Sequence, residues 1–254
     1  MVGGAMLQAF REHGVQVVAY DRYKPGFDDE SVHFEALIEC PMIFVSVPTK
    51  TNENGTQDLG PIEDVLARLK SYKYTGIVVS KCTTLPGITK TLSQHYDMRM
   101  VHYPEFLRAA HAYEDFKFQK VALVSSPNPQ DVLDVATFLR ETFPKLTLRL
   151  FDNFASTEIA KYVNNCFLAT QISFLNEMYD VCEYYRVNYQ DIIDGLAPLK
   201  ILSKNHTKVP GSDGKRGWDG YCFPKDLKAF IYRHDLMDLN VIKATIDSNS
   251  LRRK

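Results

Sequence analysis

The sequence has no apolar run close to the roughly 20 residues that a membrane-spanning helix needs. It has almost no net charge, −1 at pH 7, so no general attraction to nucleic acid or to a membrane surface is expected. Its start, MVGGAMLQAFREHG, lacks the basic residues and long apolar core of a secretory signal. With no repeats or low-complexity segments, the chain is typical of an ordinary folded protein with neither a nucleic-acid nor a membrane partner.

Paired cysteines are also missing. The five cysteines are widely spaced and form no Cys-x-x-Cys motif: Cys40, Cys82, Cys166, Cys182 and Cys222. This spacing argues against a disulfide framework and against a zinc site, so we expect reduced thiols, no metal and a cytoplasmic location. A reduced cysteine is most often a small buried apolar residue, so a reactive role needs further evidence.

The first two thirds of the chain alternate β-rich and amphipathic stretches. The β-rich segments are 15–20, 42–47, 76–80, 99–103, 120–125 and 146–151. Helical patterns lie between them, for example at 61–70 and 130–140. Near-continuous apolar strands that alternate with helices predict an α/β fold with a doubly wound, Rossmann-type parallel sheet.

The last third is predicted to be mainly helical. Residues 157–186 contain neither Pro nor Gly and carry apolar residues at helical spacing, which predicts one long helix. Shorter helices are expected at 189–195, from about Pro224 and from about Leu239, with a polar loop at 204–220 before the last two.

The start of the chain matches part of a dinucleotide-binding fingerprint. In that fold a strand runs into a glycine-rich turn, and an acid at the end of the second strand binds the ribose. Gly3 fits the last glycine and Asp21 the ribose acid, which favours NAD, while Val47, Pro48 and Thr49 would pass beneath the cofactor. The first strand and two glycines are absent, so we expect that the sequence begins late. An ordinary helix start with a solvated Asp21 explains the segment about equally well.

Cys222 is the candidate nucleophile. It lies in GWDGYCFPKD (217–226), just before the expected helix start at Pro224. The positive end of a helix dipole favours a thiolate, and Gly217 and Gly220 would let a substrate approach the backbone. A buried thiol beside a glycine-rich turn is the alternative, and it stays open.

Further polar candidates lie on the long helix and after two strands. Lys161 and Asn165 are four residues apart and share a helix face, from which they could stabilise a developing alkoxide. Thr83 and Glu105 follow strands at the carboxyl edge of the sheet, where α/β folds bind ligands. A solvated helix face, a helix start at Thr83 and a surface position for Glu105 are the alternatives.

Taken together, these segments resemble the UDP-glucose/GDP-mannose dehydrogenase family, most closely its UDP-glucose branch. They occur in the family's order: VGG with Asp21, VSVPT (45–49), KCTTLPGIT (81–89), YPEFLRAAHAYEDF (103–116), EIAKYVNNCFLATQISFLNEM (158–178) and GWDGYCFPKD (217–226). The resemblance covers nearly the whole chain. It implies an NAD-binding domain over 1–153, without its first strand, and a helical central domain over 154–254 that carries the catalytic cysteine and forms a homodimer.

The resemblance implies that a sugar C6 alcohol is oxidised twice by NAD⁺. Cys222 would attack the intermediate aldehyde, and the thiohemiacetal would become a thioester that water releases as the uronate. Lys161 and Asn165 would hold the C6 oxygen, and Asp226 would order a water or move a proton.

The resemblance also implies the remaining contacts. Thr83 would position the hydrolytic water beside the cofactor, and Glu105 would act in thioester hydrolysis. Phe106 and Leu107 match positions that contact the nucleotide sugar, and residues 210–218 match a substrate loop. UDP-glucose is the expected substrate, and polysaccharide biosynthesis the expected pathway.

The sequence departs from the family pattern at three points. The Arg-Ile-Gly stretch that many members have before the glycine loop is not evident. Ala109 stands where many members have a second glutamate, so proton transfer is expected to depend on Glu105. A second α/β domain, which grips the nucleotide in the family, has no counterpart, and we therefore expect weak or absent activity from this chain alone.

Two other functions stay open. A β-hydroxyacid-type dehydrogenase would perform one oxidation with Lys161 and Asn165 and would need no cysteine. A degenerate, non-catalytic NAD-binding or dimerisation module would account for the missing parts, although the complete set of catalytic candidates disfavours it.

Overall fold

The described residues of the computed structural model, 1–253 without the side chain of Lys204, divide into two units. The first contains residues 1–50 and 58–161, and the second contains the loop 51–57 and the chain from residue 162 onward. The division therefore falls inside the long helix. The predicted domains, 1–153 and 154–254, stay a prediction.

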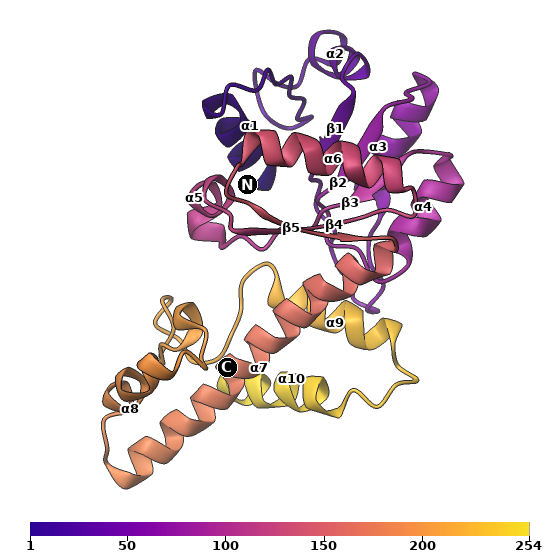
Figure 1. Cartoon of the computed structure of the whole chain (residues 1–254). Helices are drawn as coiled ribbons and strands as arrows, with labels where there is room; N and C mark the ends of the chain where they lie inside the picture. The colour runs from indigo at the N-terminus through magenta and orange to yellow at the C-terminus, as the bar shows by residue number, and fades with distance from the viewer. Residues whose placement is uncertain (254) are drawn as a thin grey trace. The chain divides into compact units, whose positions relative to one another are not determined.

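The first unit is built on a five-stranded sheet in the order β1-β2-β3-β4-β5 (Figure 1). The strands are β1 (Met42–Val45), β2 (Ile77–Ser80), β3 (Met100–His102), β4 (Val121–Ser125) and β5 (Thr147–Phe151). Neighbouring strands run parallel except β3 and β4, which pair antiparallel through His102 and Ser125. The predicted α/β fold with a parallel sheet is confirmed, except that β3 and β4 pair antiparallel.

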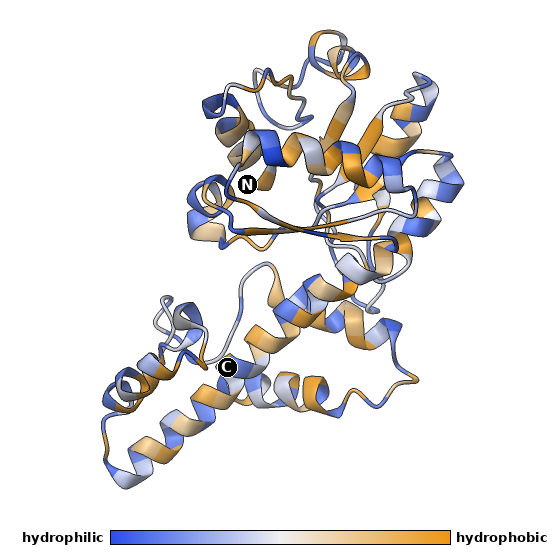
Figure 2. Cartoon of the chain, viewed as in Figure 1, coloured by the Kyte–Doolittle hydropathy of each residue, from blue (hydrophilic) through white to orange (hydrophobic). Residues whose placement is uncertain are grey.

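Helices cover both faces of this sheet. The first face packs against α1 (Val2–Glu12), α5 (Ala112–Lys117) and α6 (Pro129–Thr142), and the second against α3 (Gly60–Ser71) and α4 (Ile88–Tyr96). Along β2, Ile77 and Val79 belong to the first core and Val78 to the second, which is the period of two expected of a strand. Figure 2 shows β1 and β2 as largely hydrophobic, as strands buried on both faces should be.

The predicted strand at 15–20 was wrong. Its residues belong to no strand, and the sheet has β1 at its edge. A strand needs ladder hydrogen bonds to a neighbour, and within residues 1–253 no strand lies beside this segment. Val15 and Val17 still pack on the first core. The apolar pattern of this segment therefore reflects burial of its side chains and not pairing with a neighbouring strand. Between this segment and β1 lie a short π-helix (Glu30–Phe34) and α2 (Glu35–Ile38).

The second unit is helical, as predicted. The long helix α7 (Phe154–Tyr185) begins in the first unit and continues into the second. It is followed by α8 (Tyr189–Leu196), α9 (Phe223–Arg233) and α10 (Asn240–Arg252), with 3₁₀ turns at 109–111, 197–199 and 204–206 elsewhere in the chain. One core of this unit joins Ala169 of α7 to Trp218 and to Leu227 of α9. None of the helices in the described chain combines the length and hydropathy needed to cross a bilayer.

Candidate active site

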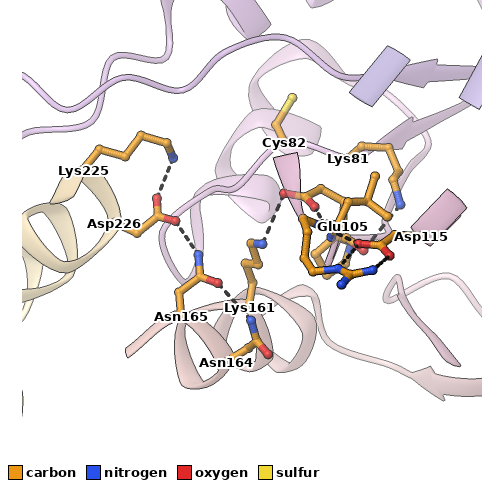
Figure 3. Close-up of polar contacts among 12 residues, drawn as sticks. Lys81, Cys82, Glu105, Asp115, Lys161, Asn164, Asn165, Lys225 and Asp226 are labelled. Atoms are coloured by element: carbon orange, nitrogen blue, oxygen red, sulfur yellow. Dashed lines mark hydrogen bonds and ion pairs between the residues drawn. The ribbon is translucent and has the colours of Figure 1, made fainter. Parts of the chain in front are cut away.

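A buried ion pair lies where the chain leaves β3 in the first unit. Lys161 Nζ donates to Glu105 Oε1 at 3.2 Å, and the two residues are only 4% and 9% exposed (Figure 3). The other carboxylate oxygen of Glu105 accepts the backbone N–H of Leu107 at 2.7 Å. Both oxygens of Glu105 are thus engaged, and burial makes the position of the Lys161 ammonium depend on this carboxylate.

Phe106 lies beside this pair. Its ring centroid is 5.4 Å from Lys161 Nζ, and the residue is 37% exposed. Leu107, the next residue, is half-buried. The structure therefore brings together four of the predicted residues: Lys161, Glu105, Phe106 and Leu107.

Lys81 is a candidate that the sequence prediction missed. The residue is 3% exposed, and its Nζ donates to the carbonyl of Pro104 at 3.4 Å and lies 3.2 Å from the ring centroid of Tyr103. Burial lowers the pKa of Lys81 to about 7; the charge of Glu105 opposes this effect. The available signal was a lysine placed directly after the strand Ile77–Ser80, at the edge where ligands bind.

Thr83 is half-buried in the loop between β2 and α4, and both of its neighbours are anchored. His102 Nε2 lies 3.1 Å from the carbonyl of Cys82, and Thr84 Oγ1 donates to Glu158. Burial lowers the pKa of His102 to about 4, so its imidazole is neutral at pH 7. The nitrogen that faces a carbonyl must carry the proton, which makes Nε2 the donor to Cys82.

A second buried carboxylate lies in the second unit. Asn165 Nδ2 donates to Asp226 Oδ2 at 2.7 Å, and Lys225 Nζ pairs with Asp226 Oδ1 at 2.5 Å. Asp226 is 1% exposed. Its negative charge is therefore balanced by Lys225 while the other oxygen orients the Asn165 amide (Figure 3).

Cys222 is the N-cap residue of α9 and is half-buried. Its carbonyl accepts the backbone N–H of Asp226 at 3.0 Å, the first hydrogen bond of the helix. Gly220, two residues earlier, is exposed and has φ +87°, a conformation that favours glycine. The thiol thus sits at the helix start that the sequence predicted, with Pro224 inside the first turn.

The proposed cofactor residues lie at the start of the first unit. A Cβ on Gly3 would come within 2.9 Å of Ser46 Oγ, so glycine lets α1 begin close to the chain that leaves β1. Asp21 is exposed, and its Oδ1 accepts the backbone N–H of Tyr23 at 3.1 Å. After β1, Val47 is half-buried, Pro48 exposed and Thr49 buried. The close approach of α1 to the end of β1 at Gly3 and the exposed carboxylate of Asp21 fit a dinucleotide site, although no contact joins these two residues.

No group of three or more metal-binding side chains occurs in the part of the chain that the structure describes. The polar groups found here are instead lysines, carboxylates and amides, which move protons and hold oxygen atoms.

Two domains of one protein family together match nearly the whole chain. Residues 2–143 match the NAD-binding domain of the UDP-glucose/GDP-mannose dehydrogenase family, and residues 155–251 match the central domain of the same family. A curated relative, the UDP-glucose 6-dehydrogenase of Rickettsia prowazekii (strain Madrid E), is 30% identical over 222 residues, which cover 83% of this chain and 49% of that protein. The chain spans about half the length of the curated relatives that it matches.

Solved structures share the fold. A UDP-D-ManNAc dehydrogenase from Pyrococcus horikoshii has a TM-score of 0.78 at 20% identity, over 98% of this chain and 66% of that one. A 3-hydroxyisobutyrate dehydrogenase from Mycobacterium tuberculosis has a TM-score of 0.71 at 15% identity, over 97% of this chain and 88% of that one. At these identities the likeness establishes the fold alone.

Proposed function

This chain belongs to the UDP-glucose/GDP-mannose dehydrogenase family, and from that premise we propose that it oxidises C6 of a nucleotide sugar to a carboxylate. UDP-glucose is the substrate we expect, because it is named in the curated relatives. The observation that carries the proposal is on α7. Lys161 and Asn165 stand one turn apart, and each is held by a buried carboxylate, Glu105 or Asp226.

Residues 2–143 are the family's NAD-binding domain. Gly3, Asp21 and residues 47–49 would hold the cofactor, with Thr83 at its reactive end. When bound, NAD⁺ supplies the acceptor for the hydride that each oxidation removes.

Lys161 and Asn165 would stabilise the sugar oxygen during the oxidations. Lys161 Nζ has three N–H groups and gives one to Glu105, while the Asn165 amide has two and gives one to Asp226. Each residue therefore retains a donor for the C6 oxygen as negative charge develops there.

Cys222 would make the second oxidation possible. Its thiolate attacks the aldehyde carbon, a C–S bond forms, and the former carbonyl oxygen takes a proton to give a thiohemiacetal. Loss of a second hydride together with the hydroxyl proton gives a thioester. Water then adds with help from Glu105 and Thr83, the C–S bond breaks, and the uronate leaves. Asp226, in the first turns of the same helix as Cys222, would order a water or take the released proton.

The product ratio tests this proposal. Any uronate that the wild-type chain forms, even at low turnover, should be accompanied by two NADH, whereas Cys222→Ser should form no uronate because the thioester cannot form. Undiminished uronate from Cys222→Ser would contradict covalent catalysis. Absence of NADH from every nucleotide sugar, with NAD⁺ binding retained, would favour a non-catalytic NAD-binding module.

A single oxidation of a β-hydroxyacid is the second candidate function. The fold is shared with a 3-hydroxyisobutyrate dehydrogenase, of which the chain covers 88%. Such a reaction would use Lys161 and Asn165 but no thiol. One NADH for each molecule of a β-hydroxyacid, unaffected by Cys222→Ser, would establish it.

The proposal also covers the oligomeric state, the location and the pathway. We propose a homodimer in the cytoplasm that supplies uronate for polysaccharide synthesis. The near-neutral charge and the five widely spaced cysteines support the location. Light scattering coupled to gel filtration tests the oligomeric state: elution as a monomer at micromolar concentration would contradict the dimer.

A further inference from the structure

A third buried carboxylate, Glu158, lies on α7 one turn before Lys161 and is not part of the proposed chemistry. Its residue exposure is 0%. It accepts four hydrogen bonds, all from residues in or just before the first turn of α4: Gly87 N–H at 2.7 Å, Thr89 N–H at 2.9 Å, Thr89 Oγ1 at 2.6 Å and Thr84 Oγ1 at 3.0 Å. Segments from two distant parts of the sequence are thus joined at one side chain.

The donors engage both oxygens of Glu158. The Gly87 N–H points at Oε2 and the Thr89 N–H points at Oε1, and a backbone N–H can only donate. In the described part of the chain no cation pairs with Glu158, so its charge is stabilised by these donors and by the positive end of α4.

Glu158 supplies a cap that α4 cannot make for itself. The N-cap residue of α4 is Gly87, at φ +93°, which has no side chain to accept the first N–H groups. Helices usually satisfy these groups with a local Ser, Thr, Asp or Asn. Here the acceptor comes from α7, so the start of α4 is tied to the helix that carries Lys161.

We propose that Glu158 is a positioning residue that holds the loop 81–87 against α7. Thr83 lies in this loop between Cys82, whose carbonyl is held by His102, and Thr84, which is held by Glu158. The clamp would fix the place of Thr83 relative to Lys161 in the same unit. This inference rests on the proposed function, because Thr83 is there assigned to the reactive end of the cofactor.

Amide exchange tests the clamp without any ligand. In the wild type the Gly87 and Thr89 amides should exchange slowly. Glu158→Gln keeps the size of the side chain but turns its NH₂ toward one of these donors, and both amides should exchange about tenfold faster, the effect of losing a charge-assisted hydrogen bond. Glu183→Gln, at an exposed position of α7, is the matched control and should leave both amides unchanged. Unchanged exchange in Glu158→Gln would overturn the clamp.

NAD⁺ titration calorimetry tests the positioning of Thr83. Glu158→Gln should weaken NAD⁺ binding about tenfold, whereas in a Thr83→Ala background the same change should weaken it less than about twofold, because the residue through which Glu158 acts is gone. Equal weakening in both backgrounds, or none in either, would overturn the positioning role.

The outcomes separate the two proposals. A wild-type chain that binds no NAD⁺ contradicts the proposed function, whereas a chain that binds NAD⁺ equally well with and without Glu158 contradicts only the positioning role. If Glu158→Gln does not fold, Thr89→Val takes its place, because it removes one hydroxyl donor and keeps the carboxylate. It should weaken NAD⁺ binding about threefold, and only when Thr83 is present; equal weakening without Thr83 would again overturn the role.

Discussion

Replacing Lys81 by methionine should stabilise the protein at neutral pH. Lys81 is 3% exposed, and burial lowers its pKa from 10.5 to about 7. Because the pKa of a base is lowered in the folded state, the unfolded state binds more protons between these two values. The stability of the wild type therefore rises with pH across that window. Methionine has a similar length and no charge, so it removes this dependence.

The magnitude follows from the shift. A displacement of about 3.5 pKa units corresponds to about 5 kcal/mol when the lysine is charged in both states. Between pH 7 and pH 9 the destabilisation caused by Lys81 falls by about 2 kcal/mol, because the amine loses its proton in the folded state. The two interactions that methionine cannot make are worth less: a long hydrogen bond contributes about 1 kcal/mol and a cation–π interaction about 2 kcal/mol.

Urea denaturation followed by circular dichroism at pH 7, 8 and 9 measures the effect. Lys81→Met should be more stable than the wild type at pH 7, and its advantage should shrink by about 2 kcal/mol by pH 9. Lys90→Met, at an exposed position of α4, is the matched control and should follow the wild type at every pH. Parallel pH dependence of Lys81→Met and the wild type would refute the reasoning.

Three further predictions concern Gly3, Cys222 and His102. In Gly3→Ala the new Cβ would lie 2.9 Å from Ser46 Oγ, so adding Ser46→Ala should raise the melting temperature of Gly3→Ala in a thermal melt; no rise would contradict the close contact. Iodoacetamide at pH 8 should label Cys222 well before Cys166, whose pKa burial raises to about 12, as peptide mass spectrometry would show; equal labelling would count against the assignment. NMR should find His102 neutral down to about pH 5, with stability falling as pH drops from 6.5 toward 4, and protonation near pH 6.5 would be inconsistent with its burial.

Helices and strands could be predicted from the sequence where the residue pattern of a single segment determines its structure. The apolar spacing of 157–186 is a property of one segment, and α7 forms there within three residues of the predicted bounds. Segment 15–20 has an equally clear β pattern, yet a strand exists only beside a partner, and periodicity says nothing about a partner. The antiparallel pairing of β3 with β4 was missed for the same reason, since it depends on how two segments meet.

The candidate active site could likewise be predicted only where the spacing within one segment determines it. The spacing of Lys161 and Asn165 places them on one helix face, but nothing local says that Glu105 and Asp226 hold them. Glu158 is an ordinary glutamate by composition, and its role arises only from the fold. Whether a charged residue is buried depends on the tertiary structure. A single sequence therefore does not reveal which charged residues of a site are buried.

The central claim is that Cys222 forms a covalent bond with the oxidised sugar. Glu105→Gln should slow hydrolysis, so the thioester should accumulate when this variant is incubated with UDP-glucose and NAD⁺. Mass spectrometry should then find a nucleotide-sugar adduct on the peptide that contains Cys222, and none when Cys222→Ser is added. Formation of NADH by Glu105→Gln without any adduct on Cys222 would contradict the account.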